Sequence, residues 1–200
     1  MISGIDLSEK NGAPDWDELG HRDVGFAYIK ASEALDSADR NYQSNRDQAE
    51  KKGILVGAYH WLHPRLHVGQ QAEFFLSAAG RMQGMLPPVV CLHTHRAPAE
   101  EIEQNIHTFL QILENKSGHK AIIYTSGEYW EKYMPDAGWA CDYRLWIDSP
   151  GTVWPKQQWP WAGWTFWQTS YKTRLPGVST QLGLNWFNGS QKELEALVIQ

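Results

Sequence analysis

The sequence predicts an α/β barrel whose second half is irregular. Short apolar runs alternate with segments of helical spacing through the first two-thirds of the chain. The run at residues 89–92 is apolar at every position, which is typical of a strand covered on both faces. After residue 125 the helical segments shorten, and strand-like runs follow one another through loops.

The elements are predicted in order from these runs and from turn residues. Strands are expected at residues 2–7, 24–30, 54–59, 89–92, 121–124, 144–148, 163–168 and 178–186. Helices are expected from residue 14 onward, at 39–52, 70–82, 99–113 and 128–133, and after Ser190. Gly53 and Gly118 close two of these helices, because glycine commonly follows a helix C-terminus. Five βα units followed by three strands predict one barrel domain over residues 1–200.

Composition and charge exclude several classes of partner. The chain has 200 residues and a formal net charge of -5, without a basic run, so nucleic acid is not an expected partner. Neither a signal peptide nor a membrane-spanning run is visible, so we expect a soluble, monomeric protein made in the cytoplasm, with no membrane partner. Two cysteines far apart in sequence do not predict a disulfide framework.

Tryptophan is unusually frequent, with eleven residues in the chain. Such density indicates either a strongly aromatic core or a surface on which flat or sugar-like ligands stack. For any single tryptophan the core is the favoured interpretation.

Polar residues stand where several predicted strands end. Parallel strands bring their carboxyl ends to one face of a barrel, where such folds place their chemistry. His93 and His95 lie two positions apart and therefore point the same way from their strand. The residues expected to converge on this face are Asp6, the stretch Lys30-Ala31-Ser32-Glu33, His60, His93, His95, Asp148 and Gln168.

Several motifs together resemble glycoside hydrolase family 25, the Chalaropsis-type lysozymes or N-acetylmuramidases that are common among phage endolysins. The matching segments include Gly4-Ile5-Asp6-Leu7-Ser8, Phe26-Ala27-Tyr28-Ile29-Lys30-Ala31-Ser32-Glu33, Gly57-Ala58-Tyr59-His60, Leu86-Pro87-Pro88, Ile123-Tyr124-Thr125-Ser126, Leu145-Trp146-Ile147, Phe166-Trp167-Gln168 and Asn185-Trp186-Phe187-Asn188-Gly189. The resemblance runs in order over nearly the whole chain. It implies a (β/α)5β3 barrel with a groove for peptidoglycan glycan strands, no cofactor, and release to the cell wall by a phage or a secretion system.

The resemblance carries over only part of the family's acidic set. Asp6 matches the first acidic residue. The family's Asp-x-Glu, which holds the general acid, falls on His93 and His95, and its late Asp falls on Gly183. Asp148 stands where the family usually has a small residue. The residues that we consider catalytic candidates are Asp6, His93, His95 and Asp148.

Retaining hydrolysis of a glycosidic bond normally needs two carboxyl groups, although an N-acetyl group of the substrate sometimes serves as the nucleophile. The sequence therefore predicts a lysozyme-like protein that recognises peptidoglycan or a related glycan with lost or strongly reduced standard hydrolysis. One alternative is an active muramidase in which Asp6 works with His95, whose imidazole titrates near pH 6.5, or with a metal held by His93 and His95. Another alternative is a non-catalytic interaction component of a phage or secretion system.

Other polar and aromatic side chains are expected to bind the glycan. Aromatic faces would form the floor of a sugar groove, and Glu33 would instead form an ion pair if it is structural. The candidates for substrate binding are Glu33, Tyr59, His60, Trp61, Tyr124, Trp146, Trp167 and Gln168.

The alignment with the family predicts which substitutions would restore its missing carboxylates. The triple change His93→Asp, His95→Glu and Gly183→Asp would rebuild the acidic set around Asp6. We expect the fold to tolerate it, because all three positions are predicted to lie at strand ends that face an open groove, where a carboxylate stays hydrated.

Overall fold

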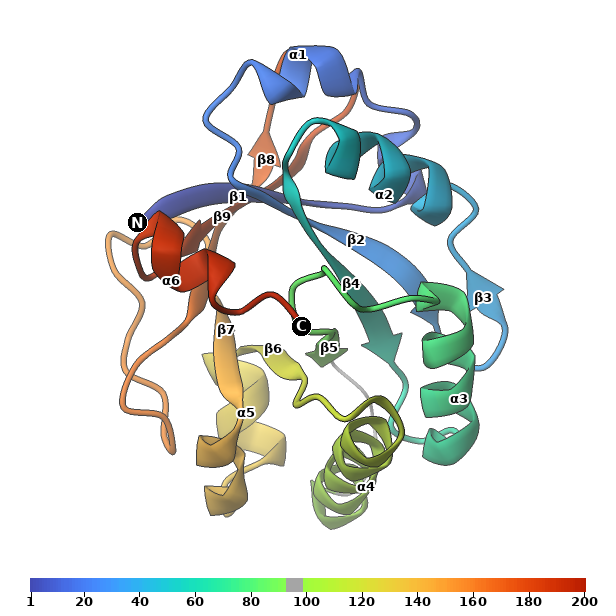
Figure 1. Ribbon diagram of the computed structural model, residues 1–200. Helices are drawn as coiled ribbons and strands as arrows, with labels where there is room; N and C mark the ends of the chain where they lie inside the picture. Colours follow the sequence, from blue (N-terminus) through green and yellow to red (C-terminus); the bar gives the residue numbers. More distant parts are fainter. Residues whose placement is uncertain (93–98) are drawn as a thin grey trace.

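Eight strands close a barrel in the part of the chain that the structure, a computed structural model, describes, namely residues 1–92 and 99–200 (Figure 1). In order around the barrel they are β1 (Ile2–Leu7), β9 (Leu182–Phe187), β8 (Phe166–Thr173), β7 (Arg144–Asp148), β6 (Ile122–Ser126), β5 (Val89–Leu92), β4 (Leu55–Leu62) and β2 (Phe26–Glu33). β1 pairs with β2 to complete the ring. β9 runs antiparallel to both of its neighbours, and the other neighbouring pairs are parallel. The predicted irregular α/β barrel is confirmed.

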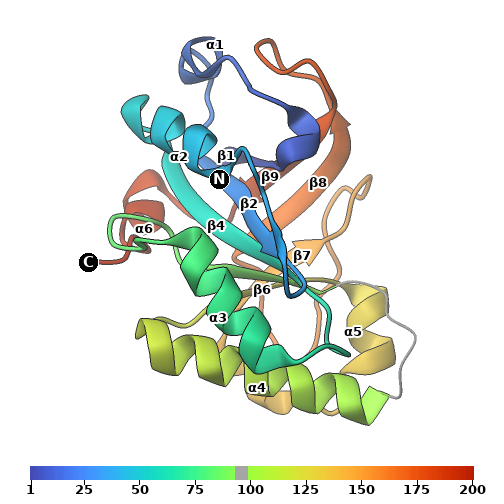
Figure 2. The same cartoon turned by 90° about the vertical axis from the view of Figure 1, so that its right-hand side faces the viewer.

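Helices cover the outside of the barrel. α1 (Trp16–Gly20), α2 (Tyr42–Lys51), α3 (Val68–Ala79), α4 (Ala99–Ser117) and α5 (Gly127–Tyr133) complete the five βα units, and α6 (Gln191–Glu195) follows β9. Figure 2 shows α3 and α4 packed against each other on one side. Among the described residues, none of these helices combines the length and apolar character needed to cross a bilayer.

Several element boundaries differ from the sequence prediction, and two of these differences have clear local reasons. The second helix begins at Tyr42 rather than at Asp39, because a short strand β3 (Ser37–Ala38) turns back on β2 and the Asp39 carboxylate accepts the backbone N–H groups of Glu9 and Asn41. The last strand begins at Leu182 rather than near residue 178. Gly177 precedes it with φ of 88°, a left-handed conformation that glycine adopts without strain.

The strands carry two separate apolar layers, because alternate side chains point to opposite faces. Inside the barrel, aromatic rings fill the space: Phe26 and Phe166 meet edge to face with centroids 5.1 Å apart, and Tyr28 lies 4.8 Å from Trp146. The outer layer, between strands and helices, contains residues such as Ile29 and Phe109. This arrangement leaves the polar ends of the strands at the mouth of an aromatic barrel.

Most tryptophans belong to the core, as the favoured interpretation expected. Trp130, Trp146, Trp161, Trp164 and Trp167 are buried. Two others in the long segment between β7 and β8 remain exposed, Trp154 at 58% and Trp159 at 53%.

Candidate active site at the barrel mouth

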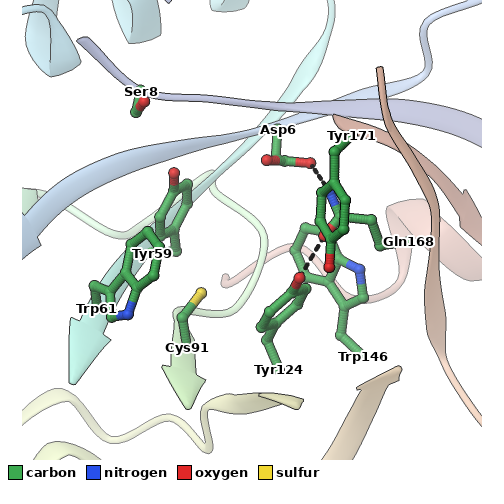
Figure 3. A pocket seen from close by; sticks show the side chains of 9 residues that line it. All are labelled: Asp6, Ser8, Tyr59, Trp61, Cys91, Tyr124, Trp146, Gln168 and Tyr171. Carbon is green, nitrogen blue, oxygen red and sulfur yellow. Dashed lines mark hydrogen bonds between the residues drawn. The ribbon is translucent and has the colours of Figure 1, made fainter. Parts of the chain in front are cut away.

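A cavity of about 220 Å³ opens at the carboxyl ends of the parallel strands (Figure 3). Its walls are formed by residues of six strands and by Ser8, which directly follows β1. Distant parts of the sequence therefore meet there. Its lining residues are Asp6, Ser8, Tyr59, Trp61, Cys91, Tyr124, Trp146, Gln168 and Tyr171. Six of these nine are among the residues considered from the sequence. The cavity therefore has an aromatic lining with one carboxyl group in its wall.

Asp6 is the best-anchored polar group of the cavity. Its Oδ1 accepts a hydrogen bond from Gln168 Nε2 at 2.8 Å and another from Asn185 Nδ2 at 2.8 Å. Burial raises the pKa of the Asp6 carboxyl to about 6; the Asn185 hydrogen bond opposes this rise, and the negative charge of Asp148 adds to it. Asp6 is therefore a carboxyl group that exchanges its proton near neutral pH, a property common at functional sites.

Asp148 lies at the end of β7, in register with Gln168 of β8. The Tyr171 hydroxyl donates a hydrogen bond to its Oδ1. Burial raises the pKa of Asp148, and the hydrogen bonds from Tyr171 and Tyr124 work against that rise. Asp148 thus contacts the cavity through two tyrosines that line it.

Gln168 connects the two acidic positions. Its Oε1 accepts the hydroxyl of Tyr124 at 2.5 Å while its amide group donates to Asp6 (Figure 3). The same Tyr124 hydroxyl also interacts with Asp148 and lowers its pKa, so polar contacts link Asp6 to Asp148 across β6, β7 and β8. Because the hydroxyl has one proton, it donates to Gln168 or to Asp148 but not to both at once.

The two candidate histidines of the fourth strand, His93 and His95, lie outside the described residues. The structure accordingly does not test the alternatives that use His95 as an acid or the pair as metal ligands. Within residues 1–92 and 99–200, no group of three or more histidine, cysteine, aspartate or glutamate side chains is arranged to hold a metal ion.

His60 lies on the other side of β4, away from the cavity. Its ring stacks on Phe109 with centroids 5.4 Å apart and is fully buried. Ser32 Oγ lies 2.9 Å from Nδ1, and Gln71 Oε1 lies 3.4 Å from Nε2. Burial lowers the pKa of His60 to about 4, so the neutral ring is the form that packs between strand and helix. We therefore remove His60 from the set of glycan-binding candidates.

Trp167 and Glu33 also lie apart from the cavity lining. Trp167 belongs to the outer layer, where its indole N–H donates to the Ser149 carbonyl at 3.0 Å. Glu33 forms an ion pair with Lys30 at 2.6 Å and contacts His63 at 3.3 Å, which is the structural role expected as its alternative. Trp167 follows the alternation of β8, which the sequence analysis did not apply to it. The orientation of Glu33 has no such signal, because the pairing of β2 with β4 shifts between Lys30 and Ser32.

The structure adds residues that the sequence analysis did not select. Ser8 and Cys91 lie two positions from Asp6 and His93, so strict period-two reasoning would have found them. Tyr171 could not be found in this way, because the pairing of β8 with β9 shifts between Gln168 and Ser170 and again before Thr173. Asn185 was recognised only as part of a motif, and its role depends on β9 running antiparallel beside β1.

Gly183 corrects the expectation for the triple restoration. It pairs with Asp6 across β1 and β9, and a Cβ atom there would lie 1.8 Å from Asp6 Oδ1 and 2.3 Å from Gln168 Nε2. The position does not face an open groove. A side chain at 183 fits only if the Asp6 carboxyl and its amide donor move.

Comparison with known proteins agrees with this architecture. The model of glycosyl hydrolases family 25 matches residues 5–178, and the chain belongs to this family. Lysozyme M1 of Streptomyces globisporus is 30% identical over 98% of this chain and 71% of that protein, and the uncharacterized protein YegX of Escherichia coli K12 is 30% identical over 98% and 73%.

Solved structures give the same result. The bacterial lysozyme from Streptomyces coelicolor superposes with a TM-score of 0.93 at 29% identity, covering 98% of this chain and 96% of that chain. A family 25 glycosyl hydrolase from Bacillus anthracis superposes with a TM-score of 0.90 at 28% identity, covering 100% and 94%. The family resemblance seen in the sequence is confirmed, and the chain has a lysozyme-like family 25 fold.

Replacing Gly183 with alanine should destabilise the protein by roughly 1–3 kcal/mol, because the added Cβ displaces the Asp6 carboxyl from its two amide donors. Urea unfolding measures the change. Gly163→Ala is the matched control, since a Cβ atom at Gly163 meets nothing within 4 Å. Equal unfolding free energies for the two variants would contradict the close approach at Gly183.

Asp6 and His60 should give stability opposite dependences on pH. Asp6, with its pKa raised to about 6, stabilises the fold at low pH, and this contribution is lost as the pH rises through 6. His60, with its pKa lowered to about 4, contributes stability above pH 6.5 that is lost as the pH falls toward 4. Asp6→Asn removes the contribution of Asp6 to stability at low pH and leaves that of His60 in place.

The Asp6→Asn variant should therefore lose stability more steeply than the wild type between pH 6.5 and pH 4. Unfolding midpoints in urea across this range provide the measurement. Asp142→Asn, an exposed change at the other end of β7, should follow the wild-type slope. Parallel curves for wild type and Asp6→Asn would show that the Asp6 pKa is not raised.

Proposed function

We propose that this protein binds peptidoglycan glycan strands in the barrel-mouth cavity and hydrolyses them far more slowly than a lysozyme with the full carboxylate set. The observation that carries the proposal is the cavity itself, in which aromatic faces surround an anchored carboxyl group at the carboxyl ends of the barrel strands. Sugar rings stack on aromatic faces and exchange hydrogen bonds with carboxyl and amide groups, so this lining suits a glycan.

Relatives support the choice of glycan. The similar proteins include Lysozyme M1 from Streptomyces globisporus and the N,O-diacetylmuramidase of Arthroderma benhamiae, which is 27% identical over 97% of this chain and 85% of that protein. We extend the substrate class in these names to the present chain. A peptidoglycan strand offers alternating N-acetylated sugars that match the aromatic lining of the cavity.

The reduced rate follows from residue types. The family's acid pair falls on His93 and His95, and its late aspartate falls on Gly183. An imidazolium beside a developing oxocarbenium ion adds positive charge where the ordinary enzyme adds negative charge. Loss of general acid catalysis alone commonly lowers the rate by about 10²–10⁴-fold.

Binding should depend on Trp61, whose side chain lines the cavity. Trp61→Ala should weaken the affinity for a soluble fragment of alternating N-acetylglucosamine and N-acetylmuramic acid by about fivefold, since a stacked aromatic face contributes roughly 1 kcal/mol. Isothermal titration calorimetry measures the affinity. Trp159→Ala removes an exposed tryptophan outside the cavity and should leave binding unchanged.

Three outcomes separate the proposal from its alternatives. Binding with slow release of reducing ends from purified peptidoglycan agrees with the proposal. Turnover at the rate of an ordinary family member would replace it with an active muramidase. No binding to the fragment or to intact peptidoglycan would favour a protein-interaction role for the barrel.

A further inference from the structure

We propose that Asp6 is the proton donor of the cavity and that Asp148 is a positioning residue that keeps the proton on Asp6. The inference rests on the proposed function. It assigns the slow hydrolysis to Asp6 and Asp148 rather than to His93 and His95, which occupy the positions of the family's acid pair. Its basis is the polar chain that joins Asp6 to Asp148 through Gln168 and Tyr124.

Asp6 has the geometry of a proton donor. Both amide donors, from Gln168 and Asn185, bind the same oxygen, Oδ1. Amide N–H groups bind an oxygen that carries no proton, so a proton on Asp6 belongs on Oδ2. Figure 3 shows that the other carboxyl oxygen points away from Gln168, toward the side of the cavity where Ser8 and Tyr59 lie. A glycosidic oxygen in the cavity is then able to receive that proton.

Asp148 is contacted by hydroxyl groups that oppose the rise of its pKa caused by burial. The Tyr171 hydroxyl donates to Asp148 Oδ1, and the nearby Tyr124 hydroxyl also favours the charged form; both tyrosines line the cavity. Its negative charge is one of the causes that raise the pKa of Asp6, after burial. Burial raises the pKa of both carboxyl groups, but the tyrosine hydroxyls oppose the rise at Asp148, whereas the charge of Asp148 adds to the rise at Asp6. A pair with such unequal surroundings is suited to divide the acid and the anionic roles.

The other titratable groups around the pair do not compete for this proton. Burial raises the pKa of each phenol and of the thiol that face it, so these groups are neutral between pH 4 and 8. On β2, the Lys30 ammonium is paired with Glu33. The facing groups, taken from every described strand around the cavity, are Lys30 on β2, Tyr59 on β4, Cys91 on β5, Tyr124 on β6 and Tyr171 on β8.

The chemical step balances without a cofactor. The Asp6 Oδ2 proton moves to the glycosidic oxygen as the bond from that oxygen to the anomeric carbon breaks, and the leaving sugar departs as an alcohol. The electron-poor anomeric carbon is held by the acetamido oxygen of its own sugar. Water then attacks that carbon and returns one proton to the Asp6 carboxylate. The net reaction consumes one water per bond.

The first experiment needs no substrate. Carbon-13 NMR of labelled aspartate side chains, followed from pH 3 to pH 8, gives the pKa of Asp6 in the wild type and in variants. Asp148→Asn should lower it by about one unit, because the charge is removed while burial remains. Asp148→Glu should keep it near the wild-type value. Asp142→Asn, which removes the same charge at the opposite end of β7, should leave it unchanged.

The second experiment measures slow hydrolysis of the soluble glycan fragment against pH, with reducing ends counted by mass spectrometry. The wild-type rate should fall as the pH rises past 6. In Asp148→Asn this fall, the alkaline limb of the pH–rate profile, should occur at lower pH. Asp6→Asn should lower the rate by at least about 10²-fold. A His95→Ala variant should keep the pH limb if Asp6 is the donor.

Each contrary result has a definite meaning. An Asp6 pKa that does not respond to Asp148→Asn overturns the positioning role. Hydrolysis that survives in Asp6→Asn but disappears in His95→Ala overturns the donor role and favours the imidazole. Glycan binding with no detectable hydrolysis also overturns the donor role and leaves the proposed function standing. Absence of glycan binding removes the proposed function, whatever the NMR titration shows.

Discussion

The antiparallel insertion of β9 between β8 and β1 is the constraint on which the rest of the structure depends. It closes the ring of otherwise parallel strands, so no sheet edge remains at this point. It also places Asn185 and Gly183 beside Asp6, one as a hydrogen-bond donor and the other as the space that the carboxyl occupies.

The aromatic interior explains why so polar a network forms at the barrel mouth. Trp146, Phe166 and Tyr28 fill the interior below, which excludes water from the base of the cavity. Carboxyl groups above such a floor lose part of their hydration, and their pKa values rise unless donors compensate. Tyr124, Gln168 and Tyr171 provide these donors, so the same low-dielectric surroundings raise the pKa values and strengthen the hydrogen bonds.

Much of the fold followed from local patterns in the sequence. Apolar runs such as residues 89–92 and the helical spacing in α4 reflect interactions within one element, and the predicted number of barrel strands therefore agreed with the structure, although the short strand β3 was not predicted. The residues of the candidate site were predicted less completely from the sequence. Period-two alternation places His60 and Trp167 on the helix side of their strands, and the sequence analysis had considered their strand-end positions without that alternation.

Other features of the site depend on pairing across the barrel and have no local signal. The irregular pairing of β8 brings Tyr171 to the cavity, and the contact of Gly183 with Asp6 arises between residues at the two ends of the chain. The roles of His93 and His95 remain predictions, because these residues lie outside the described part of the structure.

The central claim is that the glycan occupies the barrel mouth, and the indole signals of the tryptophans test it most directly. In a nitrogen-15 spectrum recorded during titration with the soluble peptidoglycan fragment, the Nε1 signals of Trp61 and Trp146 should shift, because both side chains line the cavity. The signals of exposed Trp154 and Trp159 should stay in place. Shifts confined to these exposed tryptophans would place the glycan elsewhere and contradict the account.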